Sequence, residues 1–536
     1  MKTSKEKRSD VNTSTPPQAG RREWIGLAVL ALACVLYAMD LTVLHLAVPS
    51  LSAELKPTSA QLLWIVDIYG FLVAGSLITM GTLGDRIGRR RLLLLGAAAF
   101  GVVSLLAAFS TSAGMLIVSR ALMGVAGATL APSTLSLIFN MFLDPRQRSV
   151  AIGVWISAFS AGSAIGPVLG GVLLEYFWWG SVFLLALPVM ALLLVLGPRV
   201  LPEFRDPEAR RLDLLSAGMS LASILAVIYG LKQTAQDGFG VIQATAILAG
   251  LAIGFLFLRR QRRLANPLID IRLFRIPTFN VSLATNVIAV FVAVGYFLFI
   301  AQYLQLVLEL SPLQAGLWSL PSACGFIVGS NLAPRFVHRY RPAYVLSTAL
   351  GVAAIGLATL TQVGGSTGLA VVATASIMVS LALSPVFTLT TELIVGSAPP
   401  ERAGAASGIS ETGAELGGAL GIAILGSIGT AVYRNELVNR LPSGVPSEVV
   451  KIASDTLGAA VGVAEQLPDQ LGSVLLGITR TAFVQGLHLA AAISSTVAIG
   501  AAIMILVFLR RVPARAEQEP QPNMEVSRMV QAQEEN

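Results

Sequence analysis

A short basic stretch between two long apolar segments decides how this chain folds, and it reads Gly81-Thr-Leu-Gly-Asp85-Arg86-Ile-Gly88-Arg89-Arg90-Arg91. The flanking segments, Gln61–Leu83 and Leu92–Ser110, are each long enough to cross a hydrocarbon layer about 30 Å thick. Clustered arginines between two such segments are typical of a cytoplasmic loop, and Gly81 and Gly88 permit a tight turn there. The stretch therefore predicts two membrane helices joined by a short inner loop.

The composition of the whole chain agrees with a membrane protein. Of 536 residues, 54% are apolar and only 12% are charged, and the mean hydropathy is +0.74. Soluble proteins carry about 25% charged residues, so a soluble globular protein is excluded and a lipid bilayer is the expected surrounding. The net charge of +7 does not indicate a nucleic-acid partner, because the basic residues lie in short loops rather than on one face.

Fourteen segments have the length and composition of a membrane span. They are Trp24–Val48, Gln61–Leu83, Leu92–Ser110, Ala113–Phe139, Val150–Leu174, Ser181–Leu196, Leu214–Gly230, Val241–Leu258, Phe279–Leu304, Leu313–Ala333, Tyr344–Thr361, Leu369–Leu389, Ala405–Val432 and Ala482–Leu509. This pattern predicts an all-α polytopic membrane protein.

The distribution of basic residues supports this count and orients the chain. Lys and Arg concentrate in every second loop, as they do when those loops are cytoplasmic. The outer loops would hold only Lys56, Lys232, Arg434, Arg440, Lys451 and Arg480. An even number of spans then places both termini in the cytoplasm.

An internal repeat divides the spans into two groups. The loops after the second and tenth spans align at Leu83/Leu332, Arg86/Arg335 and Arg90/Arg339, as in transporters built from two parallel repeats. We therefore expect two six-helix bundles plus two inserted transmembrane helices. The expected divisions are a cytoplasmic tail (1–23), an N-terminal bundle (24–200), the inserted segment (201–276), a C-terminal bundle (277–511) with a long outer loop (433–479), and a second tail (512–536).

The polar tails and the outer loop have their own signatures. Both tails are rich in polar residues and are expected to be disordered. Within the outer loop, Val449–Leu467 is mildly amphipathic. This segment is expected either to form a hairpin over the outer mouth or to lie on the membrane surface.

Four motifs occur in order on the expected spans, and they carry a family resemblance. They are Asp40–Pro49, Gly81–Arg91, Arg120–Gly127 and Gly162–Gly171. Together they resemble the major facilitator superfamily, and within it the fourteen-span drug:proton antiporters that export quaternary-ammonium compounds and many drugs. The resemblance covers nearly the whole chain and implies the major facilitator fold.

The resemblance implies a conformational latch at the first basic loop. Its members would be Gly81, Asp85, Arg86, Gly88, Arg89 and Arg90, and they would close the cytoplasmic side between the two halves. From the sequence we expect that only the N-termini of the neighbouring helices can lie close to Asp85. The alternative is that the arginines only set the topology.

The resemblance also implies an antiporter motif in the fifth span, formed by Gly162, Gly166, Pro167, Gly170 and Gly171. Three of these glycines are spaced four apart and share one helix face, which lets another backbone approach closely, and Pro167 bends the helix. In the family this face seals the interface between the halves and favours exchange. Ordinary tight packing is the alternative.

Ionisable residues inside the spans are expected to carry the mechanism, because a charge at that depth costs about 3 kcal/mol or more. Asp40 and Arg120 are predicted to couple protons. Asp67, Glu411 and Glu415 are predicted to offer negative charge to cationic substrates. A carboxylate in such surroundings holds either a proton or a cation, which is sufficient for exchange. A structural role is the alternative for each.

Aromatic residues are expected to complete the substrate site. Tyr37, Trp64 and Tyr303 are candidates, since aromatic faces attract organic cations; helix packing is the alternative. The tenth span, Leu313–Ala333, carries no acidic residue. Some exporters of this family that favour divalent cations carry an acid there, so the resemblance implies monovalent dyes and antiseptics rather than divalent substrates.

These features predict a secondary active transporter of the cytoplasmic membrane rather than an enzyme. It would exchange protons for lipophilic, often cationic drugs, dyes and antiseptics, using the proton-motive force and no cofactor. The sequence lacks the nucleotide-binding loop of ATP-driven pumps and the ligand spacing of zinc sites. The resemblance implies a monomer. Two alternatives are a dedicated exporter of one metabolite or antibiotic, and a non-transporting receptor or sensor.

Overall fold

The structure, a computed structural model, describes residues 18–57, 59–205, 213–264, 267–310, 312–364, 368–440, 446–510 and 512. These residues form helices and no strand, which confirms the all-α class. Most of both polar tails and part of the linker before the inserted helices lie outside the described residues, and so does the disorder expected for the tails.

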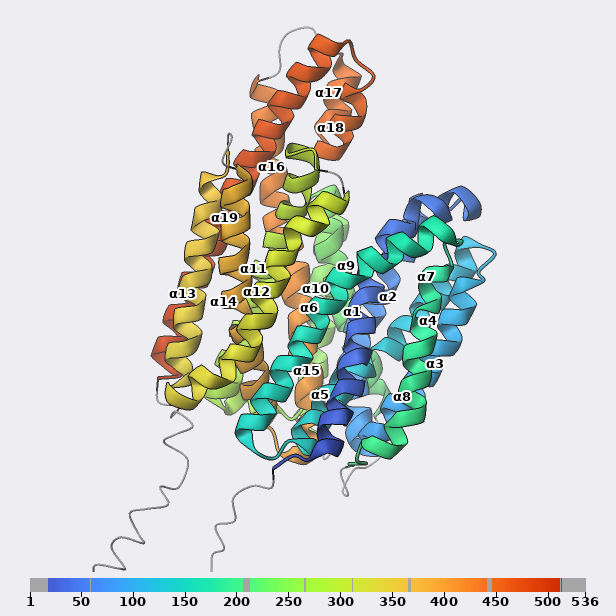
Figure 1. The fold of residues 1–536 in the computed structure, drawn as a ribbon, viewed down its shortest axis with the longest axis vertical. Helices are drawn as coiled ribbons and strands as arrows, with labels where there is room; N and C mark the ends of the chain where they lie inside the picture. The colour runs from blue at the N-terminus through green and yellow to red at the C-terminus, as the bar shows by residue number, and fades with distance from the viewer. Residues whose placement is uncertain are drawn as a thin grey trace, which may run out of the picture.

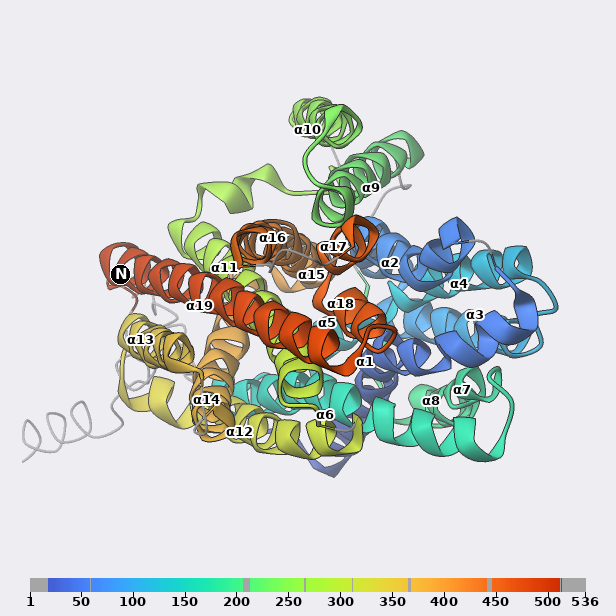
Figure 2. The same ribbon diagram turned by 90° about the horizontal axis from the view of Figure 1, so that it is seen from above.

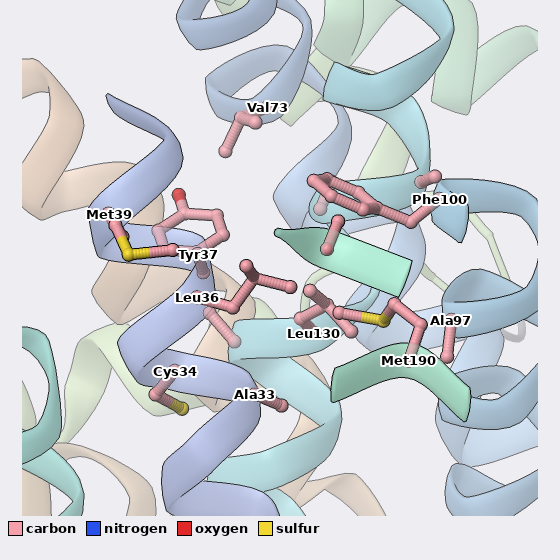
Figure 3. Packing of buried hydrophobic residues seen from close by; sticks show 14 of the residues in the cluster. Ala33, Cys34, Leu36, Tyr37, Met39, Val73, Ala97, Phe100, Leu130 and Met190 are labelled. Carbon is pink, nitrogen blue, oxygen red and sulfur yellow. The ribbon is translucent and has the colours of Figure 1, made fainter. Parts of the chain in front are cut away.

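The first bundle is built from eight helices. They are α1 (Arg21–Leu55), α2 (Ser59–Ile87), α3 (Arg89–Ala108), α4 (Ala113–Gly127), α5 (Leu130–Met141), α6 (Pro145–Tyr176), α7 (Ser181–Leu184) and α8 (Ala186–Val200). Their apolar side chains form one continuous core, which Figure 3 shows between α1 and the facing residues Val73, Phe100 and Met190. Burial of this core against neighbouring helices holds the bundle together.

The second bundle follows the same principle with a separate core. Its α-helices are α11 (Pro277–Gln302), α12 (Pro312–Arg339), α13 (Pro342–Thr359), α14 (Gly368–Gly396), α15 (Ala403–Gly421), α16 (Ser427–Arg440), α17 (Ser447–Ala453), α18 (Leu457–Ala464) and α19 (Asp469–Phe508). Short turns of other helix types join some of them: η2 (Tyr303–Val307), η3 (Leu360–Gln362), η5 (Pro400–Arg402) and η6 (Ile422–Gly426). Figure 1 shows the two bundles side by side, with α17 and α18 at one end of the molecule.

Between the bundles in sequence lie α9 (Leu214–Asp237), α10 (Val241–Gln261) and the short η1 (Ile271–Arg275). Figure 2 shows that α9 lies against α2 and that α10 lies outside α9, away from the centre. The two helices are joined at one end by an ion pair between Arg260 and Asp213, 2.8 Å long. The Ser216 hydroxyl group and Arg260 both bond to Asp213 and hold the pKa of its carboxyl group below the usual value.

Thirteen helical segments of the described chain are long and apolar enough to cross a membrane. The fourteenth expected span corresponds to α12, which has 28 residues but is more polar, with Asn331 and Arg335 near its end. Several expected spans are interrupted: Ala113–Phe139 becomes α4 and α5, and Ala405–Val432 becomes α15, η6 and α16.

The two ends of the molecule differ in charge. The start of α1 and the end of α12, with Arg21 and Arg339, lie at one end of the molecule (Figure 1), and we call it the basic end. The opposite, distal end carries the hairpin formed by α17 and α18. This hairpin packs on α19, and the Tyr433 hydroxyl group fixes it to α16 by donating to the Ala453 carbonyl over 2.7 Å.

Candidate functional site

A buried ion pair joins α1 to α4 inside the first bundle. The Arg120 Nη1 atom donates a hydrogen bond to Asp40 Oδ2 over 2.7 Å, and the two side chains are 2% and 8% exposed. A lone charge at this depth costs about 3 kcal/mol or more, and in this pair each charge is offset by the other. The structure thus brings together the two residues that the sequence analysis assigned to proton coupling.

Aromatic rings surround the guanidinium group of Arg120. Its Cζ atom lies 4.5 Å from the centre of the Tyr69 ring and 5.9 Å from that of Phe183. Its Nε atom donates to the Ile65 carbonyl over 3.4 Å. The Tyr69 hydroxyl group has no hydrogen-bond partner among the described residues. Tyr69 therefore contacts Arg120 through its ring face, as a cation–π partner.

Two carboxylates of the second bundle face this region. Glu411 and Glu415 lie one turn apart on α15 and are half-buried. Both interact electrostatically with Tyr37 of α1, whose ring packs against Phe159 and Tyr69 with centroid distances of 5.7 Å and 6.3 Å. No Lys or Arg in the described part of the chain lies within ion-pair distance of either glutamate. Among the described residues, neither glutamate therefore has a Lys or Arg in direct contact.

The remaining expected acid, Asp67 of α2, already has a partner. The Nζ atom of Lys232 lies 2.5 Å from Asp67 Oδ1. The sequence analysis assigned Lys232 to an outer loop, and this is wrong because α9 continues through it to Asp237. The inserted helix thus brings a cation to one of the expected substrate-binding residues.

Two expected aromatic contributors lie in other surroundings. Trp64 is 42% exposed and packs edge-on against Phe71, with ring centres 6.2 Å apart. Tyr303 is 2% exposed and lies in the core of the second bundle, against Gly368. Of the three aromatic candidates, only Tyr37 has a recorded interaction with Glu411 and Glu415 among the described residues.

The first basic loop joins the two bundles at the basic end. The Asp85 carboxylate accepts hydrogen bonds from the backbone N–H groups of Gly404 and Ala405, over 3.1 Å and 2.9 Å. These groups belong to the first turn of α15, where helix N–H groups lack intrahelical partners and the dipole attracts an anion. The expectation that only neighbouring helix starts reach Asp85 is therefore wrong, because the start of a helix from the other half lies against it.

Arg89 completes this contact between the halves. It is fully buried; its Nε atom donates to Asp85 over 2.9 Å, and its Nη2 atom donates to the Pro400 carbonyl over 2.6 Å. Arg90 bonds instead within the first half, to the Leu201 carbonyl over 3.0 Å. Arg86 is only half-buried at the end of α2. Arg89 is thus an arginine of the motif that reaches the second half.

Glycines allow α2 and α15 to approach closely beside this contact. A Cβ atom at Gly81 would lie 2.3 Å from the Gly404 carbonyl oxygen, and one at Gly408 would lie 2.8 Å from the Leu77 carbonyl oxygen. Gly88, between α2 and α3, has φ +109°, a conformation that favours glycine. The backbone therefore requires glycine at Gly81 and Gly88.

The glycine face of α6 lies inside the first bundle. Gly162, Gly166 and Gly170 are buried, and a Cβ atom at Gly162 would lie 2.2 Å from the Val35 carbonyl oxygen of α1. Gly171 is exposed, with no atom within 4 Å of such a Cβ atom. In this structure Gly162 thus lets α6 pack closely on α1. Pro167 lies on the same helix, and its side chain lies outside the described part.

The interface between the halves uses an earlier stretch of α6. A Cβ atom at Gly153 would lie 2.7 Å from the Ser330 carbonyl oxygen of α12, and the hydroxyl groups of Ser157 and Ser330 lie 2.6 Å apart. Nearer the basic end, the Ser149 hydroxyl group donates to Glu392 of α14. These contacts and those of Asp85 form two seams, α6 with α12 and α14, and α2 with α15.

Sequence reasoning missed three features of this arrangement. Lys232 was assigned to a loop, Arg89 was not expected to be buried, and Glu392 was not noticed. Glu392 could have been noticed in the sequence, because it directly follows the apolar segment Leu369–Leu389 and lies in the same helix. Among the described residues, no group of His, Cys, Asp and Glu side chains could hold a metal ion.

The family model of the Major Facilitator Superfamily matches residues 30–422. The chain is 42% identical over 499 residues to the multidrug efflux pump LfrA of Mycolicibacterium smegmatis, covering 93% of this chain and 98% of that protein. It is 36% identical over 468 residues to the methyl viologen resistance protein SmvA of Salmonella typhimurium, covering 86% and 93%.

Among solved structures, the human organic anion transporter MFSD10 (TETRAN) matches with a TM-score of 0.60 and 15% identity, covering 90% of this chain and 99% of that one. At this identity the likeness concerns the fold alone. The family model and the extended identity to LfrA are the stronger findings. The chain is a multi-pass membrane transporter rather than an enzyme, and it belongs to the Major Facilitator Superfamily.

Proposed function

We propose that this transporter exports lipophilic, often cationic drugs, dyes and antiseptics across the cytoplasmic membrane in exchange for protons. The observation that carries the proposal is the buried ion pair between Asp40 and Arg120. The names of the relatives, a multidrug efflux pump and a methyl viologen resistance protein, support drug efflux. Transport would be secondary and driven by the proton-motive force.

The arrangement of acids supports exchange of a proton for a cation. A proton that reaches Asp40 neutralises its carboxylate and ends its ion pair with Arg120. Glu411 and Glu415 offer two carboxylates to a cation beside the ring of Tyr37. A carboxylate at this depth is stable with a proton or with a cation. A proton on Asp40 and a cation at Glu411 and Glu415 thus each neutralise an acid of this region, and exchange requires that the two alternate.

The orientation follows from the charge of the basic end. Because Lys and Arg of short loops stay on the cytoplasmic side, we place the basic end, and with it both termini, in the cytoplasm. The contacts of Asp85, Arg89 and Ser149 then join the halves on the cytoplasmic side. With this orientation, these contacts would close the transporter toward the cytoplasm.

The experiment that tests the proposal replaces Asp40 by Asn, which keeps the size and polarity of the side chain but removes its charge. Purified protein is mixed with ethidium in weakly buffered detergent solution, and proton release is recorded with a pH indicator. Wild-type protein is expected to release protons and Asp40→Asn to release few or none.

The control for this experiment is Asp455→Asn, which alters an exposed acid of the distal hairpin and should leave proton release unchanged. Thermal unfolding of each variant separates loss of function from loss of folding. Undiminished proton release from folded Asp40→Asn would remove Asp40 from the mechanism. Ethidium export from vesicles that persists after the pH gradient and voltage are abolished would exclude exchange altogether.

A further inference from the structure

The inserted helix α9 touches both bundles. A Cβ atom at Gly75 of α2 would lie 2.4 Å from Leu221 Cδ1 of α9, so the absence of a side chain there lets the two helices approach closely. Farther along, Phe71 and Ala74 of α2, Ile228 of α9 and Ala419 of α15 form one apolar cluster. The inserted helix therefore lies where α2 of the first half meets α15 of the second.

Helix spacing places three charged residues around this cluster. Asp67 lies four residues before Phe71, Lys232 four residues after Ile228, and Glu415 four residues before Ala419. Residues four apart lie on the same face, one turn along the axis. Given the directions of the three helices, Asp67 and Lys232 lie on the distal side of the cluster and Glu415 on its basic side.

The side chain of Lys232 reaches inward from α9. Its Nζ atom lies 2.5 Å from Asp67 Oδ1 and 4.7 Å from the centre of the Phe71 ring. Lys232 and Asp67 are 27% and 21% exposed, so both are partly withdrawn from the surroundings. Lys232 also interacts electrostatically with Glu415. One cation of the inserted helix thus pairs with an acid of the first half and acts through space on an acid of the second.

We propose that Lys232 is a specificity-determining residue that limits the number of positive charges the substrate site accepts. This inference rests on the proposed function of cation export. Lys232 pairs with Asp67. Of the three acids expected to bind the substrate, Glu411 and Glu415 therefore remain in reach of a cation. A second positive charge on the substrate, directed toward Asp67, is repelled by the ammonium group. The site therefore favours monocations over elongated dications.

The test uses two dyes that share one ring system but differ in charge. Ethidium carries one positive charge, and propidium carries a second on a flexible side chain. The dissociation constant of each dye is measured by fluorescence with purified full-length protein. Lys232→Gln is expected to tighten propidium binding about tenfold relative to ethidium, which is the order of effect that one nearby charge produces.

Three further variants separate charge from structure. Lys232→Arg retains the cation and should keep the wild-type ratio of the two dissociation constants. Asp67→Asn combined with Lys232→Gln removes both charges and should restore a ratio close to wild type. Lys451→Gln alters an exposed lysine of α17 at the distal end and should change nothing.

The outcomes distinguish this inference from the proposed function. If wild-type protein binds ethidium but folded Lys232→Gln shows an unchanged ratio of the two constants, the role of Lys232 is overturned and cation export stands. An equal gain for both dyes would also overturn it, because the lysine would then act on any cation. Wild-type protein that binds neither dye would contradict the proposed function, and this inference with it.

Discussion

At the scale of single residues, Tyr69 contacts Arg120 with its ring, and its hydroxyl group has no partner among the described residues. We therefore expect Tyr69→Phe to retain transport and stability. Tyr69→Leu removes the ring face and should weaken the Asp40–Arg120 site, by about 2 kcal/mol for a desolvated cation–π contact plus the cost of the lost packing. Ethidium efflux and thermal unfolding of the purified variants measure both effects.

A second tyrosine provides the control for this experiment. Tyr37 packs against Tyr69 but has no recorded contact with Arg120 among the described residues, so Tyr37→Leu should alter cation binding more than proton release. Equal losses in Tyr69→Phe and Tyr69→Leu would show that the hydroxyl group, and not the ring, matters to Arg120.

Which site residues could be foreseen depended on how far each lay from a helix end. Asp40 and Arg120 lie well inside apolar segments, so the cost of a lone charge predicted that they have partners. Lys232 lies near the end of an expected span, where hydropathy cannot distinguish a loop residue from one that continues a helix. Arg89 was named for the latch from the resemblance, but hydropathy gave no sign of its burial. The pairing of Lys232 with Asp67 depends on the extra turns of α9 and could not be read from composition.

At the scale of helices, the close packing of α2 on α15 leads to a specific prediction. In Gly81→Ala the new methyl group meets the Gly404 carbonyl oxygen at 2.3 Å, and such overpacking costs about 1–3 kcal/mol. Because this cost exists only while the two helices are in contact, the variant should favour the state in which they separate. Spin labels at Arg91 and Glu401, on either side of this seam, should show a larger population of long distances.

Gly70→Ala is the matched control on the same helix. A Cβ atom there has no atom within 4 Å, and alanine in a helix interior is more favourable than glycine by about 0.5–1 kcal/mol. We expect unchanged distances and equal or higher stability. The labelling uses Cys324→Ser protein, since Cys324 is exposed and Cys34 is buried. A Gly81→Ala protein with wild-type distances would mean that the seam does not open at α2 and α15.

The helices themselves were largely predictable, whereas their interruptions were not. Apolar length alone located the spans, because a segment that must cross hydrocarbon has to satisfy its backbone internally. The break between α4 and α5 and the wider turns η2 and η6 depend on local packing between neighbouring helices. The helices also extend beyond the apolar segments, as in the 40 residues of α19, since polar turns continue a helix outside the hydrocarbon layer.

At the scale of the whole molecule, the two seams lie on opposite sides of the bundle, as Figure 2 shows for α2 with α15 and for α6 with α12. Each bundle is built mainly around its own core, while Val395 and Ala403 of the second half also pack into the core of the first. Each bundle can therefore move largely as a unit. If the bundles rock as rigid bodies, neither seam can open alone. A perturbation at one seam then changes the population of the open state, and the distances across both seams must report the same change.

The glycines of the two seams test this directly. Gly153→Ala places a methyl group 2.7 Å from the Ser330 carbonyl oxygen, as Gly81→Ala does against Gly404. Spin labels at Leu143 and Tyr340, both exposed at the basic end, report on the seam of α6 with α12. Gly81→Ala should lengthen this distance although it lies at the other seam. The double variant should add the two free-energy changes to within about 0.5 kcal/mol, because the sites share no partner. A response confined to Gly153→Ala would instead mean that the seams open separately, and alternation between two rigid halves would have to be abandoned.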